Sequence, residues 1–67
     1  MRLLKIHRGQ AVNLHLDGVT LHGVLVDVSA DSVSLRDARA LAADGEADLP
    51  GPVVVATSSI VWAAVIP

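Results

Sequence analysis

Residues 11–38 read AVNLHLDGVTLHGVLVDVSADSVSLRDA, and this stretch decides the fold. Its first six residues alternate between apolar and polar side chains, as in a half-buried strand, and the apolar face carries Val12, Leu14 and Leu16. The dipeptide Asp17-Gly18 follows, and it tolerates the positive φ angles of a two-residue hairpin turn. The pattern therefore predicts an antiparallel hairpin.

A two-residue turn also fixes the register of this hairpin. It pairs Leu16 with Val19, His15 with Thr20, Leu14 with Leu21, and Asn13 with His22. Gly23 then falls on the inward face, where the missing side chain lets the strand bend or a neighbouring backbone come close. After a polar turn at residues 29–32, Val33–Leu35 alternates again. We expect three antiparallel strands, bent near Gly23.

The second half of the chain predicts a loop and two more strands. Residues 36–51 are rich in Ala, Asp and Gly, so we expect a variable surface loop at about residues 38–52, with a helical turn at 38–43 as an option. Residues 53–56 and 60–66 are apolar on both faces, which is typical of strands buried on both sides. The whole predicts a single all-β domain over residues 1–67, a small five-stranded bent antiparallel barrel.

The beginning of the chain stays open between two structures. Residues 1–8, MRLLKIHR, fit a short N-terminal helix or a strand, and Gly9 ends either one.

The composition limits what such a domain can do. The chain has 67 residues, 52% of them hydrophobic, and no cysteine, so disulfides and thiolate metal sites are excluded. A domain of about 60 residues buries only about 60% of its unfolded surface, and we therefore expect a partner chain to add stability. The formal net charge of −2 argues against polyanion binding driven by overall charge. No segment predicts a membrane span or a secretory signal, so we expect a cytoplasmic protein.

The chain resembles the Sm/Lsm/Hfq family over nearly its whole length. The family's first motif is an alternating apolar strand, a glycine turn, a second strand with a glycine and an apolar third strand, matched here by Val12, Leu14, Leu16, Gly18, Leu21, Gly23, Leu25, Val33 and Leu35. Residues 59–67 resemble the closing strand of the Hfq branch. The resemblance implies an Sm-like barrel in a homo-oligomeric ring of about five to seven subunits, closed by pairing the fourth strand of one subunit with the fifth of the next.

Similar proteins commonly bind single-stranded RNA at the pore of the ring. The resemblance implies that two polar turns and the basic N-terminal segment contact the RNA, which makes the candidate RNA-binding residues Ser29, Asp31, Ser32, Thr57, Ser58, Arg2, Lys5 and Arg8. Hydroxyls can hydrogen-bond bases, and a carboxylate can accept from an exocyclic amine. The alternative is ordinary turn chemistry, since Ser and Asp side chains bond to nearby backbone groups, together with a solvated terminus.

Two functions therefore remain open. The leading hypothesis is a ring that binds single-stranded RNA. The alternative is an oligomeric structural or protein-interaction module of Sm-like fold that has lost RNA binding, because residues 56–59, ATSS, stand where similar proteins carry I-R-G or Y-K-H. A monomeric SH3-like barrel that binds peptides is disfavoured, because such domains present an aromatic groove and the single aromatic side chain here is Trp62.

The last two strands supply the predicted subunit interface, because doubly apolar strands need a partner at their edges. The candidate interface residues are Val53, Val54, Val55, Ile60, Val61, Trp62 and Val65. His15 and His22 would share the outward face of the hairpin, but two imidazoles without a close carboxylate or thiolate make a weak site, so we predict no metal and no cofactor. No catalytic motif is present, and we do not expect an enzyme.

Overall fold

The structure is a computed structural model that describes residues 7–66, so most of the segment in which a short helix was possible, residues 1–6, lies outside the described part. Six strands form one sheet: β1 (Ala11–Leu16), β2 (Val19–Val28), β3 (Ser32–Ala42), β4 (Gly45–Asp48), β5 (Val53–Ala56) and β6 (Trp62–Val65). A short 3-10 helix, η2 (Thr57–Ser59), joins β5 to β6. No helix in the described residues is long and apolar enough to cross a membrane. The prediction of an all-β antiparallel fold is confirmed.

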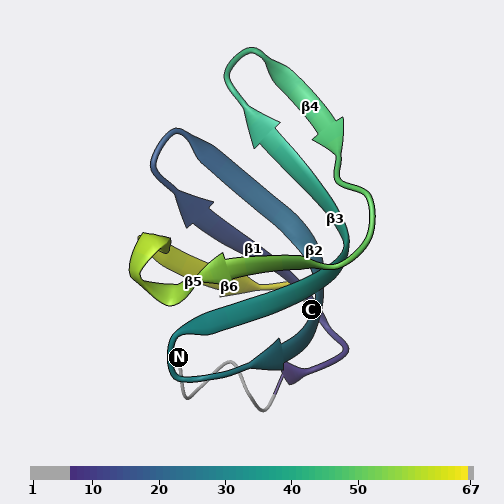
Figure 1. Cartoon of the computed structure of the whole chain (residues 1–67). Helices are drawn as coiled ribbons and strands as arrows, with labels where there is room; N and C mark the ends of the chain where they lie inside the picture. Colours follow the sequence, from purple (N-terminus) through teal and green to yellow (C-terminus); the bar gives the residue numbers. More distant parts are fainter. Residues whose placement is uncertain (1–6, 67) are drawn as a thin grey trace.

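The sheet is bent but is not closed into a barrel (Figure 1). The strand order is β4-β3-β2-β1-β6, and β5 pairs with the first half of β3, whose second half pairs with β4. β4 and β5 therefore lie one after the other along one edge of the sheet, and β6 forms the other edge. Since β5 and β6 do not pair with each other, the prediction of a closed barrel within one chain is wrong.

Most of the predicted loop at residues 38–52 is instead strand, up to Asp48. β3 continues to Ala42, a turn follows, and β4 returns beside it, which makes six strands where we expected five. In Figure 1 this hairpin extends beyond the other strands. Ala is a poor strand former, and the composition of this segment therefore suggested a loop or a helical turn. Cross-strand ion pairs from Arg39 to Glu46 and Asp48 help to hold the hairpin.

The β1–β2 hairpin follows the predicted register in all of its predicted pairs, from Leu16 with Val19 to Asn13 with His22. Gly23 lies on the inward face at a break in the pairing of β2 with β3. A Cβ atom at Gly23 would lie 3.1 Å from the carbonyl oxygen of Arg36 and 3.2 Å from the Cα atom of Ala38. The expected close approach of a neighbouring backbone is thus confirmed.

The core lies on the inward face, inside the bend of the sheet. It is entirely aliphatic and consists of Val12, Leu14, Leu21, Leu25, Val28, Val33, Leu35, Ala38 and Val55. Because side chains alternate along a strand, the neighbours of these residues, among them Asn13, His15 and Val54, point to the opposite, outward face.

Candidate functional site

The two polar turns that were predicted from widely separated parts of the sequence lie against each other. The backbone N–H of Thr57 in η2 donates to the carbonyl oxygen of Asp31 at 3.0 Å, and the Thr57 hydroxyl lies 3.4 Å from the carbonyl oxygen of Ala30. The β2–β3 turn and η2 therefore form one continuous polar surface. We call it the polar turn cluster, made of Ser29, Asp31, Ser32, Thr57 and Ser58.

Much of the hydrogen-bonding capacity of this cluster is used within the β2–β3 turn. The Ser29 hydroxyl lies 3.1 Å from Asp31 Oδ1 and 2.8 Å from the Ser32 hydroxyl, and it accepts from the backbone N–H of Ser32 at 3.2 Å. These are the bonds expected of ordinary turn chemistry. Ser29, Asp31 and Ser58 are nevertheless exposed, so these three residues remain accessible to a ligand.

The basic residues proposed to contact RNA are described only in part. Arg2 and Lys5 lie outside the described residues. Arg8 is exposed, and its Nη1 atom lies 3.9 Å from Asp27 Oδ1. A long ion pair between two exposed side chains contributes about 0–1 kcal/mol, so it holds the guanidinium only loosely.

The predicted interface residues divide into two groups. Val55 is buried, and Val53, Ile60 and Val65 pack against the core, so these four residues stabilise the subunit itself. The other three are exposed: Val54 by 68%, Val61 by 71% and Trp62 by 53%. Val54 and Trp62 lie on the edge strands β5 and β6, and Val61 directly precedes β6. These three exposed apolar side chains are the predicted interface residues that remain available to a partner.

Within residues 7–66, β5 and β6 each have one edge to which no other strand pairs. In this part of the chain β5 pairs only with β3, and β6 pairs only with β1. No residue from 53 to 66 carries a charged side chain. We call these two surfaces the β5 edge and the β6 edge. Unpaired backbone groups without nearby charges are a template for pairing with another strand.

Trp62 stacks on His15, a contact that the sequence did not predict. The two residues are directly opposite each other in the pairing of β1 with β6, their ring centroids are 3.4 Å apart, and the ring planes differ by 17°. His15 Nδ1 also lies 3.1 Å from the Thr20 hydroxyl, and Asn13 Oδ1 accepts from His22 Nδ1 at 2.6 Å. Both imidazoles are therefore engaged with their own cross-strand neighbours.

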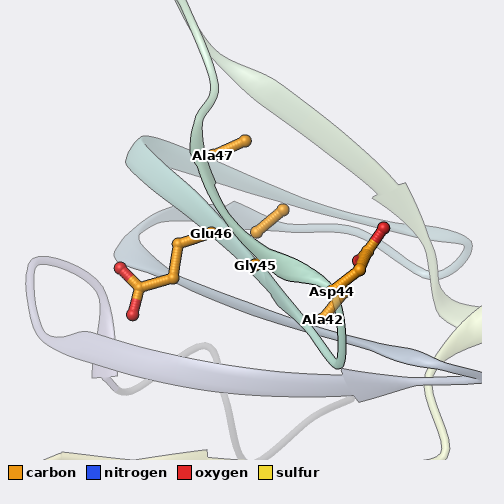
Figure 2. Close-up of a pocket in the computed structure, with 6 residues that line it drawn as sticks. Ala42, Asp44, Gly45, Glu46 and Ala47 are labelled. Atoms are coloured by element: carbon orange, nitrogen blue, oxygen red, sulfur yellow. The ribbon is translucent and has the colours of Figure 1, made fainter.

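The hollow drawn in Figure 2 does not bring together a catalytic or metal-binding set. It lies at the tip of the β3–β4 hairpin, has a volume of about 250 Å³, and is lined by Ala40, Ala42, Asp44, Gly45, Glu46 and Ala47. The two carboxylates in it point in different directions (Figure 2). Within residues 7–66 there is no group of three or more side chains able to hold a metal ion.

Comparisons with protein-family models and with curated proteins find no match to this chain.

Proposed function

We propose that the chain assembles edge to edge into an Sm-like homo-oligomeric ring of about five to seven subunits and binds single-stranded RNA through the polar turn cluster. The observation that carries this proposal is the pair of uncharged strand edges on opposite sides of one small sheet, both of them unpaired among the residues that the structure describes. Two different edges on one subunit pair head to tail, and such heterologous contacts close into a ring when the rotation between subunits allows it.

The arrangement of the strands supports a closed assembly over an isolated subunit. The sheet formed by the described strands is open, and pairing of the β5 edge with the β6 edge of the next copy would satisfy the backbone groups that each edge leaves unpaired. A domain of this size also has little stability to spare without a partner. Assembly would therefore complete the barrel-like arrangement that a single chain does not close.

The polar turn cluster supports the RNA part of the proposal. η2 directly connects the two edge strands, so the cluster would lie beside each subunit contact and be repeated around the ring. Repetition multiplies a weak contact, because each further subunit binds the same strand at a raised effective concentration. Hydroxyls and one carboxylate recognise base edges, whereas the absence of an aromatic side chain from the cluster removes about 1–3 kcal/mol of stacking per base.

Mass measurement by light scattering coupled to size exclusion tests the assembly. A closed species of five to seven protomers is expected. Fluorescence anisotropy with A-rich and U-rich oligonucleotides then tests RNA binding, with salt-sensitive affinity in the micromolar range as the expected result. No salt-sensitive binding to either oligonucleotide would leave a ring without the RNA function.

A matched pair of substitutions locates the RNA contact. Asp31→Ala is expected to weaken binding to the A-rich oligonucleotide, because adenine presents an exocyclic amine to the carboxylate. Asp17→Ala removes the same charge from the exposed turn at the other end of β2 and should leave affinity unchanged or slightly higher. If Asp31→Ala and Asp17→Ala both bind the oligonucleotide more tightly, Asp31 affects binding only through its negative charge and does not contact a base.

A second function is favoured by the hydrogen bonds inside the cluster. Ser29 bonds to both Asp31 and Ser32, and this leaves fewer groups for a ligand. Together with the net charge of −2, this favours a ring that serves as a structural or protein-interaction module without RNA. The anisotropy titration separates the two functions.

A further inference from the structure

Trp62 is the one large aromatic side chain of the protein, and the structure fixes the direction in which its uncovered face points. His15 and Trp62 are opposite each other on neighbouring strands, and their rings stack across that strand pair at 3.4 Å. One face of the indole is therefore covered by β1. The other face of the indole points away from β1, toward the β6 edge.

The β5 edge presents a matching surface on the same face of the sheet. Val54 lies between two inward-facing valines, so its side chain points outward, as does that of Ala56 two residues on, and both are exposed. Trp62 is outward-facing too, because it pairs with outward-facing His15. If the sheet continues from one copy into the next, outward faces meet outward faces, and the indole lies beside Val54 and Ala56.

We infer that the uncovered face of Trp62 docks on Val54 and Ala56 of a second copy of this chain, with His15 acting as the positioning residue that holds the indole over the edge. This inference rests on the proposed function, since it names the side-chain contact within the proposed edge pairing. The absence of charge from residues 53–66 fits a second copy better than a charged partner. A rigid, pre-oriented aromatic at the centre of an apolar contact is also the usual form of an interface hot spot.

Because Trp62 is the only Trp, Tyr or Phe residue in the chain, its fluorescence reports on this contact directly. The experiment measures emission and acrylamide quenching over a dilution series, with the mass of the same samples from light scattering and a free indole compound as the exposed standard. In the assembled protein we expect emission at shorter wavelength and quenching several-fold weaker than in the dissociated chain.

If the protein assembles while the indole stays as accessible as in the dissociated chain, the inference is wrong and the edge pairing stands without it. A monomer at every concentration removes the edge pairing and the inference together.

Substitutions then identify the partner surface. Val54→Lys should prevent assembly and keep the indole accessible, whereas Val26→Lys, at an exposed valine of the central strand β2, should leave the assembly intact. Trp62→Val keeps a good strand former at the edge and should raise the protomer concentration at half-assembly by about tenfold or more. Circular dichroism of each variant confirms that the subunit remains folded. Equal disruption by both lysine variants, or no effect of Trp62→Val, would overturn the inference.

Discussion

The β4 edge and the β5 edge lie one after the other along the same strand, β3, yet they are built from different residues. β4 reads GEAD, is exposed at every position, and carries two carboxylates beside Arg39. β5 reads VVVA and has no charge. Proteins protect exposed edges with charged side chains, so β4 has the composition of an edge that stays in solvent, and β5 has that of an edge that needs a partner. The comparison teaches that exposure alone does not identify an interface.

The largest effect is expected from a change at the bend that separates the two edges. Gly23→Val would place a branched side chain against the backbone of Arg36 and Ala38, where even a Cβ atom comes within 3.2 Å. We expect a loss of about 1–3 kcal/mol in the free energy of unfolding, a large share for a small domain. Urea denaturation measures it. Val24→Ile, the outward-facing neighbour, is the control and should change stability little; equal losses in both variants would mean that the bend is not the cause.

Much of the region around that bend was predictable from the sequence, because its determinants are local. Asp17-Gly18 fixes a two-residue turn, the turn fixes the register, and the register places Gly23 inward. The β3–β4 hairpin was missed because Ala38, Ala40 and Ala42 carry little strand preference. Asp44-Gly45 is a turn signal, but the turn lies one residue earlier, at Ala43-Asp44, so the dipeptide does not give the register on which the ion pairs of Arg39 depend.

The sequence predicted the separate segments of the candidate site but not the contacts between them. The polar turns were recognised as separate segments, but their contact through Thr57 and Asp31 depends on how β5 pairs with β3. The stack of His15 on Trp62 joins the first and last strands, and non-local pairing of this kind leaves no periodic signal in either segment. In the same way, the alternation of Val53, Val54 and Val55 between core and solvent is invisible in a run of identical residues.

The next largest effect is expected from giving the β4 edge the uncharged composition of the β5 edge. The double substitution Glu46→Val and Asp48→Val removes every charged side chain from β4, and we expect species larger than the wild-type assembly, increasing with concentration. Analytical ultracentrifugation measures them. Glu46→Lys with Asp48→Lys is the matched control, because it breaks the same ion pairs but keeps the edge charged. Larger species in the lysine variant as well would show that loss of the ion pairs, not loss of charge, exposes the edge.

A smaller effect is expected at the β6 edge from His15→Ala. The substitution removes the ring that supports Trp62, and a stacked aromatic pair contributes about 0.5–1.5 kcal/mol beyond its buried area. The protomer concentration at half-assembly should therefore rise several-fold in His15→Ala. His15→Phe keeps a ring beneath Trp62 and should assemble like the wild-type protein. His22→Ala is the control, because His22 shares the outward face but bonds to Asn13 instead of stacking. Light scattering over a dilution series measures the assembly midpoint. If His22→Ala shifted this midpoint as much as His15→Ala, the prediction would be wrong.

The smallest effect belongs to the ion pairs of β4. Arg39 lies 2.6 Å from Glu46 and 3.0 Å from Asp48, but all three side chains are more than half exposed. Arg39→Met keeps the apolar stem, and we expect it to lower the free energy of unfolding by only about 0.2–1 kcal/mol, with the difference shrinking as salt is added. Arg36→Met is the control, because Arg36 pairs with the adjacent Asp37 and links no strands, so its loss should cost less.

The outcome at Arg39 also decides what the charges on β4 are for. Without Arg39 the two carboxylates are unpaired but still charged, so Arg39→Met should not cause the additional association expected from the double valine variant. A small loss of stability without new association would mean that the carboxylates act by keeping the edge solvated. A loss well above 1 kcal/mol would instead mean that they hold the hairpin together. In that case the difference between β4 and β5 would reflect how each strand is stabilised on β3, and the uncharged composition of β5 would no longer by itself favour it as the edge that pairs.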